Sequence, residues 1–244
     1  MELKDVLESK VYLKENSAVS FMSPSTYIQP FLDVVKDREL HVNVSDSVIN
    51  ANDDNTQNIA YTRVNIEAIL DSPIPGFQSR VGMIYALDIQ KPMVRIYSGQ
   101  RAVACMNLTI FNSEKVFTQD LLGNYTDAYR KAEEYVEQKQ KEIEEFTATY
   151  NELTQTLLDR EQLNEELGRL LRVASKTRVG TTPIVGAAKL VDDSSSAYYV
   201  KAGDTCSRWN LFNAITQNFS NREEKEVMDT PIKVVQLSKL FNLN

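Results

Sequence analysis

A change from strand-like to helical periodicity near residue 126 constrains the fold more than any other feature of this sequence. From Thr126 to Leu157 apolar residues recur at steps of three or four, which is the spacing of one face of an α-helix. The run Asp-Arg-Glu-Gln that starts at Asp159 resembles a capping box and begins a second helix over residues 160–174. The sequence therefore predicts a helical pair over residues 126–174, with one continuous rod as the alternative.

Strand signals precede this helical region. Three short apolar runs, over residues 78–89, 92–97 and 102–111, are separated by brief polar turns, a pattern that predicts an antiparallel β-meander. Alternation along the second run places Arg95 and Tyr97 on the face opposite Val94 and Ile96. Closer to the N-terminus, residues 26–36 have helical spacing, and residues 41–44 and 59–70 are compatible with strands.

The C-terminal third is less regular. Residues 184–191 are compatible with a short strand or an extended arm, and residues 231–243 form a final apolar element. Between them, Trp209, Phe212, Ile215 and Phe219 recur at steps of three or four, which predicts a helix over residues 205–219. We therefore expect one α+β domain over residues 1–244, with a central antiparallel sheet covered by the helices of residues 126–174 and 205–219. A hydrophobic content of 42% in 244 residues is enough for a sizeable core.

The chain is acidic on average but basic in patches. Its formal net charge is −7, and the segment from Asp127 to Arg169 holds twelve acids against six bases. The segment from Arg169 to Lys189 contains five bases and no acid. A local excess of either sign is a better guide to binding partners than the net charge of the whole chain.

Several classes of enzyme are disfavoured. A single histidine, His41, and two distant cysteines, Cys105 and Cys206, do not form a usual zinc site or a histidine-based catalytic group. No phosphate-binding glycine motif of the P-loop or Rossmann type occurs. We therefore expect no enzymatic activity, no cofactor and no metal, with both cysteines buried. No apolar stretch is long enough to span a membrane, and the expected location is the reducing cytoplasm of a host cell.

Polar segments leave two minor alternatives open. The pairs Asp53 with Asp54 and Asp192 with Asp193 offer oxygen ligands for a divalent cation, although solvated turn residues are the favoured interpretation. The segment 180–182, Gly-Thr-Thr, follows two bases and offers backbone donors to a single phosphate, against the simpler interpretation of an exposed loop.

Basic and aromatic side chains on the predicted strands suggest a surface that follows a phosphate backbone and stacks bases. The bases after the helical pair extend this surface, because that helix is expected to pack on the sheet. A solvated sheet face with ordinary charges is the competing interpretation. The candidate nucleic-acid-binding residues are Arg80, Lys91, Arg95, Tyr97, Arg101, Arg172, Lys176 and Arg178.

Two segments carry a family resemblance. Residues 101–109, Arg-Ala-Val-Ala-Cys-Met-Asn-Leu-Thr, resemble a signature of the phage/plasmid-like protein family of unassigned function. Residues 209–217, Trp-Asn-Leu-Phe-Asn-Ala-Ile-Thr-Gln, are similar to the C-terminal pattern of the same family. The resemblance implies an origin in a phage or another mobile element but no mechanism. The strand and helix order is also similar to the core of phage single-strand annealing proteins, an analogy of fold alone.

The leading hypothesis is a non-catalytic bacteriophage protein that binds single-stranded nucleic acid and assists annealing or recombination. The rival is a phage structural or protein-interaction protein, acting in host takeover or against host defence, which forms a homo-oligomer or binds a partner through its acidic helices. The apolar stripe of the first helix, from Ile143 to Leu157, would form that interface, unless it packs on the sheet of its own chain. A metal-dependent hydrolase or nuclease that uses the aspartate pairs is a distant third.

Overall fold

The fold is α+β, as predicted, with an antiparallel sheet and several long helices. The structure is a computed structural model that describes residues 7, 24–38, 41–50, 61–70, 72, 74–87, 93–103, 107–120, 125–220 and 229–243. The chain divides into two compact units. Unit 1 comprises residues 1–71, 79–98 and 115–139, and unit 2 comprises residues 72–78, 99–114 and 140–244. The expectation of a single domain stays a prediction.

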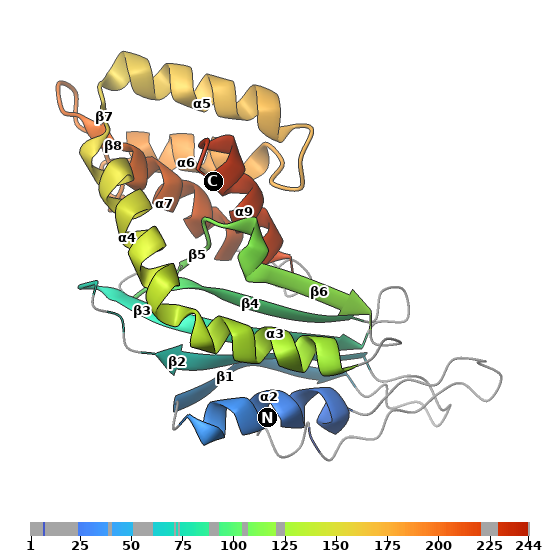
Figure 1. Cartoon of the computed structure of the whole chain (residues 1–244). Coiled ribbons are helices and arrows are strands. Elements are labelled where there is room, and N and C mark those ends of the chain that lie inside the picture. Colours follow the sequence, from blue (N-terminus) through green and yellow to red (C-terminus); the bar gives the residue numbers. More distant parts are fainter. Residues whose placement is uncertain are drawn as a thin grey trace. The chain divides into compact units, whose positions relative to one another are not determined.

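Unit 1 contains most of the sheet (Figure 1). The strand order is β1-β2-β3-β4-β5, and β6 pairs with β4, so neighbouring strands follow one another along the chain as a meander requires. β3 and β4 each have one end in unit 2. The elements of unit 1 are α2 (Pro24–Asp37), β1 (His41–Asn50), β2 (Tyr61–Leu70), β3 (Phe77–Leu87), β4 (Met93–Ala102), β6 (Val116–Asp120) and α3 (Tyr125–Glu137).

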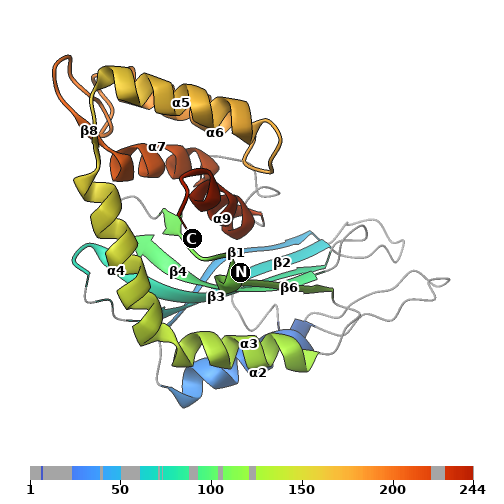
Figure 2. The same ribbon diagram turned by 45° about the horizontal axis from the view of Figure 1, so that its top comes forward.

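The core of unit 1 lies between one face of the sheet and the pair α2 and α3. In both ribbon views these two helices run side by side (Figures 1 and 2). Phe31 of α2 and Tyr135 of α3 pack in the same buried cluster as Ile66, Val94 and Ile96 of the strands. The predicted alternation in β4 is therefore correct for Val94 and Ile96, which face this core.

Unit 2 is mainly helical. Helix α6 lies beside both α5 and α7 in this unit (Figure 1). A two-stranded sheet of β7 and β8 joins the start of α5 to the start of α7. The elements are β5 (Leu108–Thr109), the 3₁₀ helix η1 (Ser113–Lys115), α4 (Lys139–Gln155), β7 (Leu157–Leu158), α5 (Arg160–Ala174), α6 (Thr182–Asp192), β8 (Cys206–Ser207), α7 (Arg208–Ser220) and α9 (Thr230–Leu240); η1 and α4 each have one terminal residue in unit 1.

Aromatic side chains form the centre of unit 2. Phe77 contacts Phe146, Tyr150 and Trp209, with ring centroids 5.3 to 5.7 Å apart. Phe146 also stacks on Phe111 at 5.0 Å. Such rings bury a large apolar area, and pairs at this distance add specific edge or offset contacts. The aromatic spacing that predicted α7 therefore marks a true core face.

The predicted helical pair is only partly correct. The capping box at Asp159 is present, since the Asp159 side chain accepts from the Gln162 backbone and the Gln162 side chain accepts from the Asp159 backbone. The helix that follows spans Arg160–Ala174, as predicted. In place of one helix before it there are two, α3 and α4, which are separated at Gln138. The apolar spacing continues across Gln138 and therefore did not reveal the break.

Two predicted strands are also different. Residues 184–191, expected as a strand or arm, belong to helix α6. Pro183 stands in its first turn, where a proline costs no hydrogen bond and its fixed φ favours a helix start. The run 102–111, expected as one strand, holds only the end of β4 and the two residues of β5, and β6 was not predicted.

Candidate nucleic-acid interface

The aromatic and basic side chains predicted on the sheet face are buried. Arg80, Arg95 and Tyr97 are 3%, 2% and 1% exposed, so no nucleic acid reaches them in this structure. Lys91 lies outside the described residues, and Arg101 is half-buried at the end of β4. The predicted binding surface on the strands is therefore wrong for its three central residues.

A hydrogen bond across three strands explains the burial of Tyr97. The Tyr97 hydroxyl, on β4, donates to Glu67 Oε1 on β2 at 2.6 Å, and Arg80 Nη1 on β3 lies 3.5 Å from Glu67 Oε2. Gly82 of β3 pairs with Glu67 and lies beneath the Tyr97 ring, since a Cβ at Gly82 would be 2.1 Å from Tyr97 Cζ. The ring can reach Glu67 only because position 82 has no side chain.

Arg95 is held by its own strand neighbours. Its Nε donates to Thr118 Oγ1 of β6 at 2.9 Å, and Thr118 is its partner in the β4–β6 register. Its Nη2 also lies 3.5 Å from Met93 Sδ. A guanidinium that already donates to the sheet is a structural group, since a buried charge is retained only where its donors are satisfied.

The remaining predicted bases are exposed and lie close together in unit 2. Arg172 is in the last turn of α5, and Lys176 and Arg178 lie in the short connection to α6. We call these three residues the basic turn. No acid occurs from residue 167 to residue 191, so the charge of the basic turn is not neutralised by its neighbours in sequence.

The backbone of the basic turn is fixed by hydrogen bonds within unit 2. The Arg178 backbone N–H donates to Gln236 Oε1 of α9 at 2.9 Å. The Thr177 hydroxyl donates to the Ala174 carbonyl at 3.0 Å and accepts from the Val179 backbone at 3.2 Å. These bonds hold the connection in one conformation. The side chains of Lys176 and Arg178 therefore extend from a backbone of fixed geometry that directly follows Arg172.

A pocket of about 550 Å³ lies beside α5, within the size range of small-molecule sites. Its lining side chains are mostly polar, and Arg172 of the basic turn is one of them. The lining also includes Asn164, Glu166, Gly168, Arg169 and Arg208. The exposed basic turn therefore continues into a concave polar surface.

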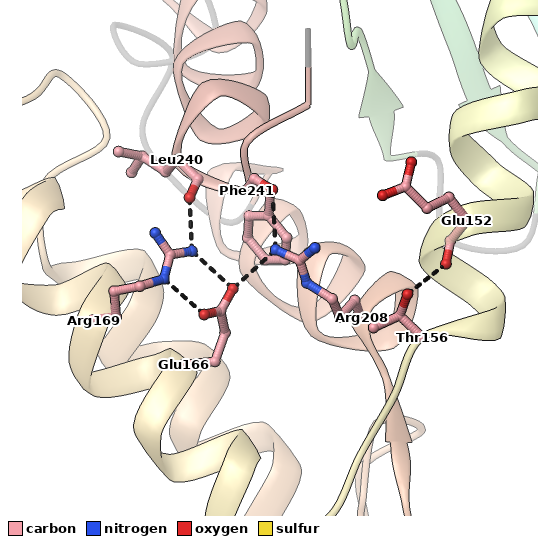
Figure 3. Close-up of polar contacts among 7 residues, drawn as sticks. All are labelled: Glu152, Thr156, Glu166, Arg169, Arg208, Leu240 and Phe241. Atoms are coloured by element: carbon pink, nitrogen blue, oxygen red, sulfur yellow. Dashed lines mark hydrogen bonds and ion pairs between the residues drawn. The ribbon is translucent and has the colours of Figure 1, made fainter.

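A three-residue ion network forms one wall of this pocket. Glu166 lies between two arginines (Figure 3): it accepts from Arg169 Nε at 2.7 Å, from Arg169 Nη2 at 2.8 Å and from Arg208 Nη2 at 3.1 Å. The same arginines donate to the Leu240 and Phe241 carbonyls at 2.7 and 3.0 Å. Since the last carbonyls of a helix lack partners within the helix, the network also caps the C-terminal end of α9.

The ionisation of this network is set by its contacts. Burial raises the pKa of the Glu166 carboxyl, but the hydrogen bonds and charges of Arg169 and Arg208 outweigh burial, so the pKa lies below its ordinary value. The hydrogen bond to Glu166 raises the pKa of Arg169. Glu166 is therefore an anion at neutral pH that engages two cations. The Arg172 side chain, in contrast, has no hydrogen bond or ion pair with any described residue, although the Arg172 backbone carbonyl accepts from the Ser175 hydroxyl at 3.0 Å.

Gly168 lines the pocket and lies in the middle of α5. A glycine within a helix costs about 1 kcal/mol relative to alanine. A Cβ at Gly168 would meet nothing within 4 Å, whereas a Cβ at Gly186 of α6 would lie 2.2 Å from Asn218 Oδ1 of α7. A Cβ at Gly186 would therefore displace the Asn218 side chain, whereas no packing contact accounts for the glycine in α5.

Several of these residues were not predicted as part of the site. Glu166 and Arg169 are three positions apart in α5, a spacing that allows an ion pair. Arg208 gives no such signal, because its partners are 42 and 33 residues away in the chain. Gly168 was detectable as a glycine within a helical pattern, but the open space around it was not.

Of the two aspartate pairs, the structure describes Asp192 and Asp193, and both side chains are exposed and accept hydrogen bonds from nearby residues. Asp192 Oδ1 accepts from Arg160 Nη1 at 2.7 Å, and Asp193 Oδ1 accepts from the backbone and hydroxyl of Ser195 at 2.9 and 2.7 Å. The Ser195 backbone N–H, followed by its hydroxyl, lowers the pKa of Asp193. Asp53 and Asp54 lie outside the described residues. In the part of the chain that the structure describes, no three acidic, histidine or cysteine side chains group as metal ligands.

The apolar stripe of the acidic region is largely occupied within its own chain. Ile143, Phe146 and Leu153 of α4 are buried, and only Leu157, beyond the helix, is exposed. A coiled coil between protomers needs an exposed seam of such residues. Self-association through this stripe is therefore not favoured by the structure.

The two segments that carry the family resemblance meet in unit 2. Asn107 Nδ2 donates to Asn213 Oδ1 at 2.8 Å, and the Thr216 hydroxyl donates to the Asn213 carbonyl at 3.0 Å. Asn107 is fully buried, so its side chain has a structural role in joining β5 to α7.

Comparisons of the chain with models of known families, with curated proteins and with solved structures found no match. The resemblance to phage/plasmid-like proteins stays a prediction. Among the helices that the structure describes, none has both the length and the apolar character needed to cross a membrane.

Proposed function

We propose that this chain is a non-catalytic bacteriophage protein that binds single-stranded nucleic acid through the basic turn. The observation that carries the proposal is the exposure of Arg172, Lys176 and Arg178 within a segment that contains no acid. Guanidinium and ammonium groups on a fixed backbone are suited to phosphate oxygens. The short resemblance to phage/plasmid-like proteins supports the proposed origin.

The position of the basic turn relative to helix α5 also bears on the proposal. The basic turn lies at the C-terminal end of α5, where cations offset the negative end of the helix dipole. That stabilising role explains one or two cations at this point, but Arg178 lies beyond the helix and, among the described residues, forms its hydrogen bond to Gln236 through the backbone N–H and not through its side chain. Its side chain is therefore available to a ligand.

A fluorescence anisotropy titration with a labelled 20-nucleotide single strand tests the proposal. Three phosphate contacts predict a slope of about −2 for the logarithm of affinity against the logarithm of salt concentration. Affinity should then fall about 18-fold between 50 and 200 mM salt. Lys176→Glu should weaken binding and reduce the slope, whereas Lys36→Glu, an exposed lysine on α2 with the same charge change, should leave both unchanged. Equal losses in the two variants, or no binding at low salt, would refute the proposal.

A further inference from the structure

We infer that the pocket lined by Gly168 is a binding site for a nucleoside phosphate. Where the bound nucleotide is part of a nucleic-acid strand, this inference rests on the proposed function. The starting point is the glycine itself. It sits inside a helix, faces open space and lines the pocket. A missing side chain that no packing contact requires is explained when a ligand approaches the helix backbone closely.

The residues around Gly168 determine the class of ligand. Asn164, Gly168 and Arg172 are spaced four residues apart and therefore lie in one row along α5. Arg172 offers the bidentate fork that matches a phosphate, and its side chain has no partner among the described residues. Asn164 offers a donor and an acceptor, as the edge of a base requires. A flat ring between these two groups would pack on the bare backbone at Gly168.

The ion network of Glu166, Arg169 and Arg208 also lines the pocket and adds to its preference for an anion. Glu166 engages Arg169 and Arg208, and these arginines also donate to backbone carbonyls. The charged residues that line the pocket are three arginines and two glutamates. The net positive charge favours a phosphate-bearing ligand.

This site would explain a preference for single strands. In a duplex the edges of the bases are paired and stacked, so a base reaches a side pocket only after it leaves the stack. A nucleotide of a single strand reaches it without that cost. The basic turn would contact phosphates, which are the same for every base. The pocket would add one contact to a base, and that base must be unpaired.

The test uses the full-length protein and adenosine monophosphate as the probe, followed by titration calorimetry or ligand-observed NMR. Gly168→Leu fills the pocket, and its Cβ has no steric obstacle. It should weaken binding about tenfold or more, because the new side chain occupies the space of the bound ring. Arg172→Gln should weaken binding by a similar factor, because it removes one charge-assisted contact to the phosphate. Gly168→Ala, which adds one methyl group, is the matched control and should stay within about fourfold of the parent. Adenosine without phosphate should bind more weakly than the monophosphate.

Each failure has a separate signature. If the parent chain does not bind the monophosphate, or if Gly168→Leu binds it as well as the parent with an equal or higher melting temperature, the pocket assignment is overturned. A change in self-association by light scattering in Gly168→Leu, without any nucleotide binding, would also overturn it, since the glycine would then serve a protein contact. If the monophosphate binds but an unlabelled single strand does not displace it, the pocket assignment holds for free nucleotides alone, and the anisotropy titration decides the proposed function separately.

Discussion

Replacement of Glu166 by glutamine should destabilise unit 2 through the loss of its ion network. The carboxylate accepts three hydrogen bonds from Arg169 and Arg208. Glu166 and Arg208 are 15% and 17% exposed at the side chain, and Arg169 is 34% exposed. A fully buried pair that loses one partner costs about 3–5 kcal/mol, and an exposed pair about 0.5 kcal/mol. The intermediate exposure gives an expected loss of about 2 kcal/mol.

Trp209 makes this change measurable. It is the single tryptophan of the chain, it is buried in unit 2, and it follows Arg208 directly. Urea unfolding followed by its fluorescence therefore reports on the unit that contains the network. With a slope of about 2 kcal/mol per molar urea, the midpoint should fall by about 1 M. Glu165→Gln, which removes the exposed neighbouring carboxylate, is the control and should change the midpoint little.

The effect should also depend on pH in a defined direction. Because folding lowers the pKa of Glu166, its stabilising contribution is fully present above the ordinary glutamate value of about 4.3 and disappears as the pH falls through the lower folded value. The difference between the parent and Glu166→Gln should therefore be constant at neutral pH and shrink under acid conditions. A loss below about 0.5 kcal/mol at pH 7, or a difference that grows in acid, would refute the reasoning.

Three further outcomes are expected. Gly82→Ala should cost about 3 kcal/mol in the free energy of unfolding, because a methyl group collides with the Tyr97 ring; a thermal melt within about 2 °C of the parent would contradict it. Asp159→Ala removes the capping box shared with Gln162 and should cost about 1 kcal/mol in chemical unfolding. Burial raises the pKa of the Cys206 thiol, so maleimide labelling located by mass spectrometry should miss Cys206 in the folded protein at pH 7 and detect it in urea.

Periodicity was enough to predict the elements that bury one face. The predicted bounds of the helix at residues 160–174 are both correct, and its predicted capping box is present. The alternation in β4 correctly separated Val94 and Ile96, which lie in the core, from Arg95 and Tyr97. Both signals are local, because a cap or a buried face leaves its mark within a few residues. The helical content of residues 182–192 was missed because Gly and Ala among β-branched residues fit either structure.

The binding surface was harder to predict because exposure is a property of the folded chain. Arg95 and Arg172 are both arginines among apolar neighbours, yet one donates to Thr118 within the sheet and the other is exposed at the end of α5. Nothing local to Arg95 indicates that its strand face is covered. The position of Arg208 beside Glu166 likewise depends on how α7 packs against α5, which no local spacing records.

The contact between Tyr97 and Gly82 restricts how this sequence can vary. The ring of one residue occupies the volume in which the other would carry a side chain. A related chain with a side chain at position 82 must therefore have a smaller residue at position 97, and Glu67 would then lose its hydroxyl donor. The three positions should change together or not at all, so a set of relatives would show them as a linked group spread across three neighbouring strands.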